Sequence, residues 1–295
     1  MIIINIIGGL GNQLFEYATG KAVAMRLNVP LKIDLHPLKY ISTIDTIRHL
    51  ELDNYNIDYT LSTDTDLKPF FFNRKNNSFI NRKFNVLYRA FHSAYLLKER
   101  LAFQYDSRIE KISSNTYLSG YFQSYKYFDS IREVLLHEFS LKEKMSDENE
   151  KLLEKIQSSN SVSIHFRRGD YVSNPHTKAH HGVCEKSFYV NAIRHITSRL
   201  ENPAFFIFSD DLDYVKSCGI MDGEKAHYVE GNNGATDLFL MRNCKHNIIA
   251  NSSLSWWGAW LNENKHKIII APKKWIINVN QFKEQNLIPP TWLSL

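Results

Sequence analysis

The sequence predicts an α/β protein made of two halves, each a parallel β-sheet with helices on its faces. Short apolar runs alternate with segments of helical periodicity near both ends of the chain, which is typical of strands joined by crossover helices. A polar, charged segment at about residues 140–161 separates these two stretches. We therefore expect an N-terminal domain over residues 1–150 and a C-terminal domain over residues 151–295.

Composition narrows the class of protein. The 295 residues are about two domains long, and the 43% share of hydrophobic residues is enough for ordinary buried cores. The opening MIIINII lacks the basic start and small-residue cleavage pattern of a signal peptide, so we expect a buried strand there. The three cysteines are far apart and odd in number, which predicts neither a disulfide framework nor a zinc site and favours a reducing, cytoplasmic setting.

The elements follow from the spacing of apolar residues. In the N-terminal half we expect, in order, a strand at residues 2–7, a glycine-rich turn, a helix at 12–27, a strand at 29–35, a helix within 82–101, a strand at 116–118 and a helix start near Ser124. In the C-terminal half we expect strands at 161–166, 204–209, 226–229, 247–250 and 267–272, with helices at about 186–200, 213–217, 235–242 and 254–262.

Ligands of open parallel sheets bind beyond the carboxyl ends of the strands, and four strand ends here carry suitable residues. The first is IIGGLGNQLF, in which Gly8, Gly9 and Gly11 let the backbone approach a ligand. Asn12 and Gln13 can cap the following helix or contact a hydroxyl group. A tight turn that serves only the topology is the alternative.

The second strand end is SVSIHFRRGDYV, which places two arginines beside a turn. His165 and Arg167 lie on one face of the strand, while Arg168 faces the other way or bends with the turn. Two rigid, permanently charged guanidinium groups indicate an anionic ligand, most simply a phosphate. Asp170 can hold an arginine or accept a proton, and a purely structural pair between an arginine and Asp170 is the alternative.

The third strand end supplies carboxylates, and the fourth supplies groups that can bind an anion. Asp210 and Asp211 follow FFIFS and can cap a helix, bind a ribose or base, or bind a metal. Asn251, Ser252 and Ser253 lie between a strand and a helix, where hydroxyl groups and backbone amides suit an anion. Packing is the expected role of the tryptophans that follow, Trp256, Trp257 and Trp260. Together the four ends predict a site for a nucleoside diphosphate without a Walker lysine loop.

Five segments together resemble the bacterial α-1,2-fucosyltransferases of glycosyltransferase family 11. They are GGLGNQLFEYA, LSGYFQSYKYF, HFRRGDY, FSDD and NIIANSSLSWWGAWLN, in the family's order from residue 8 to residue 262. The resemblance implies a GT-B fold of two facing α/β domains, with the acceptor on the N-terminal domain and GDP-fucose on the C-terminal one. It also implies an inverting transfer to the 2-hydroxyl of a galactose-terminated oligosaccharide or lipid-linked glycan, as in O-antigen biosynthesis, without a metal or other cofactor.

By this resemblance Arg167 binds the diphosphate, with His165, Arg168 and Asp170 around it. Residues 251–253 would lie at the nucleotide, and the loop from Gly9 to Gln13 would approach the sugar. From its own position after a strand, Asp210 is a further candidate for binding the substrate. Asp170 and His165 are both candidates for the general base, with Asp170 preferred, although either can serve only to orient the arginines. Glu16 stands where the family pattern has glutamine, which argues against Glu16 as an indispensable base.

Two other classes of function compete with this interpretation. Asp211–Asp213 has the Asp-x-Asp form of metal-dependent glycosyltransferases, as does Asp64–Asp66, although its polar surroundings favour a solvated loop. The histidines of NPHTKAHHG, which could suggest a metal, are expected in a wet loop: His176, His180 and His181.

The second class is a basic binding module. Residues 71–111 contain nine basic and three acidic residues, but no signature of a nucleic-acid-binding fold accompanies them, so nucleic acid is not an expected partner. A basic, aromatic helix in this stretch could rest on the cytoplasmic face of the anionic inner membrane, and a solvated helix face is the alternative.

Overall fold

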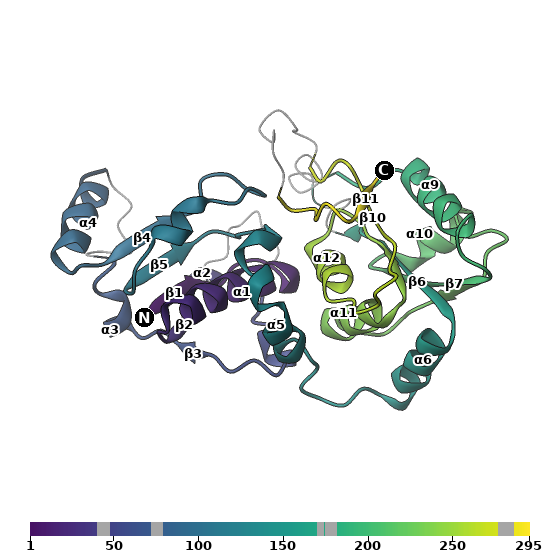
Figure 1. Ribbon diagram of the computed structural model, residues 1–295, viewed down its shortest axis with the longest axis horizontal. Coiled ribbons are helices and arrows are strands. Elements are labelled where there is room, and N and C mark those ends of the chain that lie inside the picture. Colours follow the sequence, from purple (N-terminus) through teal and green to yellow (C-terminus); the bar gives the residue numbers. More distant parts are fainter. Residues whose placement is uncertain (40–47, 72–78, 170–173, 175–181, 277–285) are drawn as a thin grey trace. The chain divides into compact units, whose positions relative to one another are not determined.

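The computed structural model describes all residues except 40–47, 72–78, 170–173, 175–181 and 277–285 (Figure 1). The chain forms two compact units. The first consists of Met1–Phe139 and a short segment near the C-terminus, and the second contains the rest. The division therefore falls between Phe139 and Ser140, whereas residue 150, the predicted boundary, lies inside a helix of the second unit, α6 (Asp147–Ser158).

The N-terminal unit is built on a parallel sheet with the strand order β3-β2-β1-β5-β4. Its strands are β1 (Ile2–Asn5), β2 (Leu31–Asp34), β3 (Thr60–Leu61), β4 (Tyr95–Lys98) and β5 (Thr116–Ser119). The central strand β1 has every residue buried, as expected for a strand covered on both faces. The predicted strand at the start of the chain is confirmed.

Helices connect these strands. The α-helices are α1 (Leu10–Leu27), α2 (His36–Lys39), α3 (Asp64–Leu67), α4 (Phe79–Phe91) and α5 (Arg132–Glu138), and the 3-10 helices are η1 (Leu52–Asn54), η2 (Ser107–Lys111), η3 (Tyr125–Tyr127) and η4 (Asp129–Ile131). Helix α1 ends where Asn28 adopts a left-handed conformation with φ of 51°, a common helix terminator. No helix in the described parts of the chain has both the length and the apolar character needed to cross a bilayer.

Two predictions for this unit are wrong. The single helix expected within residues 82–101 ends at Phe91, because Ser93 has a positive φ of 50° and the chain then turns into β4. In β4 Leu97 is buried while Tyr95 and Lys98 are exposed, so the apolar residues there serve a strand at the edge of the sheet. Asp64–Asp66, expected in a solvated loop, belong to α3, whose start is capped by Thr63.

The C-terminal unit contains a second parallel sheet, with the order β11-β10-β9-β6-β7-β8. Its strands are β6 (Asn160–Phe166), β7 (Pro203–Ser209), β8 (Ala226–Tyr228), β9 (His246–Ile248), β10 (Ile269–Ala271) and β11 (Leu293–Ser294). Besides α6 its helices are α9 (Lys186–Thr197), α10 (Leu212–Ser217), α11 (Gly234–Asn243) and α12 (Ser253–Trp260). The strands and helices expected in this half are confirmed, with ends that differ by a few residues.

Sheet and helices of the second unit share one apolar core. Alternate residues of β6, Val162, Ile164 and Phe166, pack with residues of α9. Phe166 stacks on Tyr189 with ring centroids 4.0 Å apart, and the Tyr189 hydroxyl donates to the backbone oxygen of His165 at 3.1 Å. This packing fixes the carboxyl end of β6, from which the two arginines emerge. The predicted fold, an α/β protein with parallel sheets in two domains, is confirmed.

Candidate active site

The carboxyl ends of β6 and β7 form the core of the candidate site. The two strands are neighbours in parallel register, with His165 opposite Phe208 and Phe166 opposite Ser209. Residues that follow β6 therefore lie beside residues that follow β7. In this way the sheet brings Arg167 and Arg168 next to the aspartates of FSDD, which are more than 40 residues away along the chain.

Each arginine is held by one aspartate. Arg167 Nη1 lies 2.8 Å from Asp210 Oδ2, and Arg168 Nε donates to Asp211 Oδ2 at 2.9 Å. Asp210 also accepts a hydrogen bond of 2.8 Å from the backbone amide of Arg168. One carboxylate thus fixes both the guanidinium of Arg167 and the backbone beside it, while about a quarter of the Arg167 side chain stays exposed.

Arg168 has an aromatic partner besides its aspartate. Its guanidinium carbon lies 3.3 Å from the centroid of the Tyr214 ring, so the arginine is stacked as well as paired. Its partner Asp211 caps α10 by accepting from the Tyr214 amide at 3.2 Å. Both Asp211 oxygens therefore accept hydrogen bonds from protein groups, and Asp211 joins the start of α10 to Arg168.

Gly169 is required by this arrangement. A Cβ atom on Gly169 would lie 2.5 Å from Asp210 Oδ2, much closer than real Cβ atoms approach an oxygen. Any side chain at this position would displace the carboxylate that holds Arg167. The glycine of the RRGD motif is thus explained by close approach to Asp210, a reason that was not evident from the sequence.

His165 is buried and electrically neutral. Its side chain is 5% exposed, and Nδ1 has no hydrogen-bond partner among the described residues. Burial lowers the pKa of His165 to about 4; Asp210 opposes this shift and Arg167 adds to it. A neutral imidazole at this place adds no positive charge to the anion site. The other candidate base, Asp170, lies outside the described residues, as do His176, His180 and His181.

The serines and asparagine after β9 surround the start of α12. Asn251 is 2% exposed, and its amide donates to the backbone oxygens of Gly182 and Trp275, each at 3.2 Å. Ser252 precedes the helix without a side-chain cap, and Ser253 is its first residue, half-buried. Asn251 therefore joins two loops to the end of the sheet, and the two serines are the members of this motif at the helix N-terminus.

The three tryptophans of α12 pack in the interior, as predicted. Trp256 and Trp257 are fully buried and Trp260 is 5% exposed. The rings of Trp256 and Trp260 stack with centroids 6.0 Å apart. They anchor the helix whose N-terminus carries the serines.

The glycine-rich loop of the N-terminal unit leads directly into helix α1. Helix α1 begins at Leu10 rather than at residue 12, with Gly9 as its N-cap, so Gly11, Asn12 and Gln13 belong to its first turns. Gly8, which precedes them, has a φ of +74°, a conformation that favours glycine. The turn is therefore tighter than the sequence suggested, and most of the predicted ligand groups are part of the helix.

Gln13 serves the protein interior. It is fully buried, and its amide donates to the backbone oxygens of Gly8 at 3.0 Å and His49 at 2.7 Å. Its Oε1 accepts from the backbone amide of Glu51 at 2.9 Å. Two of these contacts tie the loop to residues 49–51 and the third holds Gly8, so backbone groups of the unit occupy the Gln13 amide.

Asn12 and Gly9 have neighbours that link other parts of the unit to the loop. Asn12 Oδ1 accepts from Gln123 Nε2 at 2.8 Å, which joins the GGLGNQ segment to the LSGYFQSYKYF segment. A Cβ atom on Gly9 would lie 3.4 Å from Arg48 Nη1, so a cationic side chain that we did not predict lies beside the loop.

Two carboxylic acids of the N-terminal unit, Glu16 and Glu99, have pKa values raised by burial. Glu16 is fully buried, with Oε2 accepting from the Ile7 amide at 2.9 Å and Oε1 lacking a partner among the described residues. Burial raises the pKa of Glu16 well above its usual range. Burial also raises the pKa of Glu99, which accepts from the amides of Tyr121 at 2.8 Å and Phe122 at 3.1 Å. Glu99 was not predicted, because its contacts join segments far apart in sequence.

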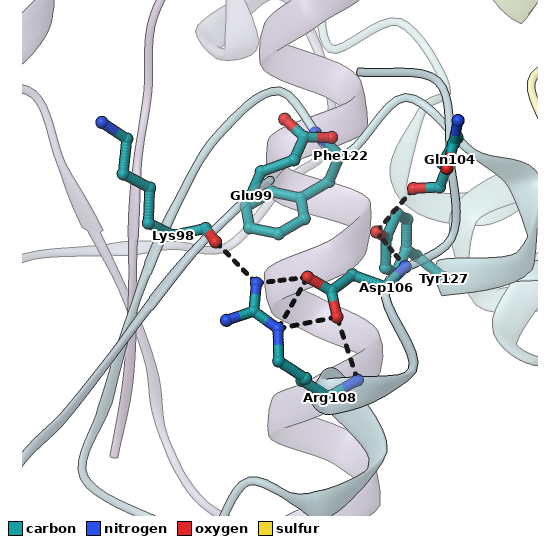
Figure 2. A network of polar contacts seen from close by, with 7 residues as sticks. All are labelled: Lys98, Glu99, Gln104, Asp106, Arg108, Phe122 and Tyr127. Atoms are coloured by element: carbon teal, nitrogen blue, oxygen red, sulfur yellow. Dashed lines mark hydrogen bonds and ion pairs between the residues drawn. The ribbon is translucent and has the colours of Figure 1, made fainter. Parts of the chain in front are cut away.

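A polar network fixes the loop that follows Glu99 (Figure 2). Arg108 donates to both oxygens of Asp106 and to the backbone oxygen of Lys98. The Tyr127 hydroxyl accepts from the Asp106 amide at 2.8 Å and lies 3.0 Å from the backbone oxygen of Gln104, to which it donates. Arg108, whose side chain is 28% exposed, is thus paired with Asp106 and belongs to the framework of the unit.

Sequence comparison with known proteins shows the family of this chain. The family described as Glycosyl transferase family 11 matches residues 1–295. The chain belongs to glycosyltransferase family 11. An alpha-1,2-colitosyltransferase of Escherichia coli is 36% identical over 282 residues, 93% of this chain and 92% of the relative. The O-antigen biosynthesis glycosyltransferase WbnK of Escherichia coli is 33% identical over 301 residues, 98% of each chain.

A solved structure supports the fold assignment of this family 11 glycosyltransferase. A mutant of Arabidopsis thaliana FUT1 in complex with GDP aligns with a TM-score of 0.53 at 11% identity, covering 92% of this chain and 70% of that chain. At such low identity the likeness shows the fold alone. The predicted GT-B class and the predicted family are therefore confirmed.

Proposed function

We propose that this family 11 enzyme transfers L-fucose from GDP-β-L-fucose to the 2-hydroxyl of a terminal β-galactose, with inversion at the sugar carbon. The observation that carries the proposal is the arginine pair after β6, held by the aspartates after β7. It supplies a fixed cationic group at the place where open parallel sheets bind ligands. The resemblance of five motifs to those of α-1,2-fucosyltransferases supports this choice of donor and linkage.

The proposed reaction is a single displacement. The acceptor oxygen forms a bond to the fucosyl carbon while the bond from that carbon to the β-phosphate oxygen breaks, and GDP leaves with the bonding electrons. Negative charge builds up on the β-phosphate as this bond breaks, so a guanidinium already in place stabilises the transition state more than the bound donor. Arg167 has this role, and Asp210 positions it.

The acceptor hydroxyl also loses a proton, for which we propose Asp170 as the base. His165 is the weaker candidate, because its side chain is only 5% exposed and an acceptor hydroxyl has little access to the imidazole. Replacing Asp170 by asparagine should remove the fall in kcat that protonation of the base causes at low pH. A pH profile of kcat that is unchanged in this variant would exclude Asp170 as the base.

A second donor is favoured by one comparison. The relative that is 36% identical is named a colitosyltransferase, and colitose is fucose without its 3-hydroxyl group. The two GDP-sugars therefore present the same diphosphate to Arg167 and differ only at one sugar hydroxyl. A site built to hydrogen-bond that hydroxyl would reject the deoxy sugar strongly, whereas an apolar site would not.

The proposal also covers the acceptor and the absence of a metal requirement. An O-antigen glycan, free or lipid-linked, is the acceptor class that the name of WbnK suggests. We propose that the Arg167 guanidinium neutralises the diphosphate charge that a divalent cation neutralises in metal-dependent glycosyltransferases. The test is to incubate the protein with GDP-fucose or GDP-colitose and a panel of β-galactosides, with and without EDTA, and to determine the product linkage by NMR. Loss of activity in EDTA would support the metal-dependent alternative instead.

A further inference from the structure

Helix α4 turns large apolar side chains away from the protein. Phe84, Leu87 and Phe91 are spaced so that they share one face of the helix. They are 57%, 70% and 86% exposed, respectively. Such a stripe is normally the face that a helix buries, so its exposure indicates a surface that meets something apolar. Figure 1 shows α4 at the edge of the N-terminal unit, beside β4.

The opposite side of the helix attaches it to the unit. Asn85 and Arg89, four residues apart and away from the stripe, are half-buried, and the Arg89 guanidinium donates to the backbone oxygen of Phe70 at 3.3 Å. The backbone oxygen of Arg89 accepts from the Ala94 amide at 2.8 Å, which joins the helix end to β4. The polar side thus faces the protein, and the outward apolar stripe follows from the way the helix is seated.

The charge around the stripe selects the kind of partner. Residues 71–111 contain nine basic and three acidic residues, and Lys83, Lys98 and Arg100 are exposed. An anionic lipid surface attracts such a basic segment and also accepts aromatic and aliphatic side chains at its headgroup boundary. A second copy of the chain would bring the same positive charge to the contact and be repelled.

We propose that α4 is a membrane-docking helix that lies in the headgroup layer of an anionic bilayer, with Phe84, Leu87 and Phe91 directed into it. The exposed basic residues of the stretch then face the lipid phosphates. This attachment is peripheral and independent of the transfer reaction, since it uses neither the arginines after β6 nor the glycine-rich loop. It would place an enzyme beside substrates that are carried on lipids.

The test is co-sedimentation of the full chain with vesicles of phosphatidylglycerol mixed with phosphatidylcholine, and with vesicles of phosphatidylcholine alone. We expect binding to the anionic vesicles that weakens with salt. The double variant Leu87→Ser/Phe91→Ser should bind about 10- to 100-fold more weakly, because each side chain loses part of its apolar burial. The matched control, Met25→Ser/Leu61→Ser, removes two apolar side chains that are 45% and 50% exposed elsewhere in the unit and should bind normally.

A second variant keeps the test decisive if the first is poorly folded. Lys98→Glu/Arg100→Glu reverses two exposed charges and should abolish the preference for anionic vesicles while circular dichroism and the melting temperature stay unchanged. The proposal is overturned if the wild-type chain fails to sediment with anionic vesicles, or if both variants bind like the wild type. It is also overturned if light scattering shows a dimer that Leu87→Ser/Phe91→Ser dissociates.

Discussion

Replacing Asp210 by asparagine tests whether this residue acts through Arg167. The variant keeps the shape of the side chain and removes the charge that lies 2.8 Å from the guanidinium and 2.8 Å from the Arg168 amide. Hydrogen bonds to charged groups contribute about 1.5–3 kcal/mol each. Since the pair is about one quarter exposed, screening reduces this value, and we expect a loss of about 1–2 kcal/mol of transition-state stabilisation.

That loss corresponds to a fall in kcat of about 5- to 30-fold. KM for the GDP-sugar should change little if Asp210 positions Arg167, whereas it should rise with kcat unchanged if Asp210 instead contacts the nucleoside, as the sequence suggested. Steady-state kinetics with a β-galactoside acceptor separates the two outcomes. A double variant with Arg167→Lys should be less impaired than the product of the single effects, because the two residues act together. Additive effects would refute the reasoning.

Three further outcomes are expected. Arg167→Ala should lower kcat by at least about 100-fold, as for removal of one donor to a developing oxyanion, with the melting temperature nearly unchanged; near-normal transfer would show that the arginine was assigned wrongly. Gly169→Ala should lower kcat in the same way as Asp210→Asn, because its Cβ meets the Asp210 carboxylate, and normal kinetics would contradict that steric account. Glu16→Gln should make the protein more stable at about pH 8 and flatten the dependence of stability on pH. The pKa of Glu16 is raised by burial, so the wild type loses stability as pH rises above the unfolded value of about 4.3. Melting curves at two pH values measure this, and a variant that loses stability as steeply as the wild type would disprove it.

The sequence was sufficient for most of the elements of the two sheets and for the residues that follow the strands, because both depend on local patterns. The apolar run before HFRRGD and the turn after it predict a strand end with two cations, and the structure has that strand end at Phe166. The tryptophans of α12 were correctly assigned to packing for the same reason: their spacing and neighbours are local.

Partners across the sheet could not be predicted, because they depend on strand order. The structure shows aspartates from the end of β7 against Arg167 and Arg168, a pairing that was not predicted, while the predicted alternative partner Asp170 lies outside the described residues. In the same way Gln13 was expected near a ligand, and only the fold shows that residues 49–51 occupy its amide. Strand β4 was missed because its four residues continue the apolar spacing of the helix before it.

The most direct measurement is a crystal structure of the protein with GDP, in the presence and absence of a divalent cation. The account predicts that the β-phosphate lies within hydrogen-bond distance of the Arg167 guanidinium, with the Arg167–Asp210 contact retained and no cation between the phosphates and the aspartates. A pyrophosphate bound away from the end of β6, or one held through a metal ion by Asp211 and Asp213, would contradict it.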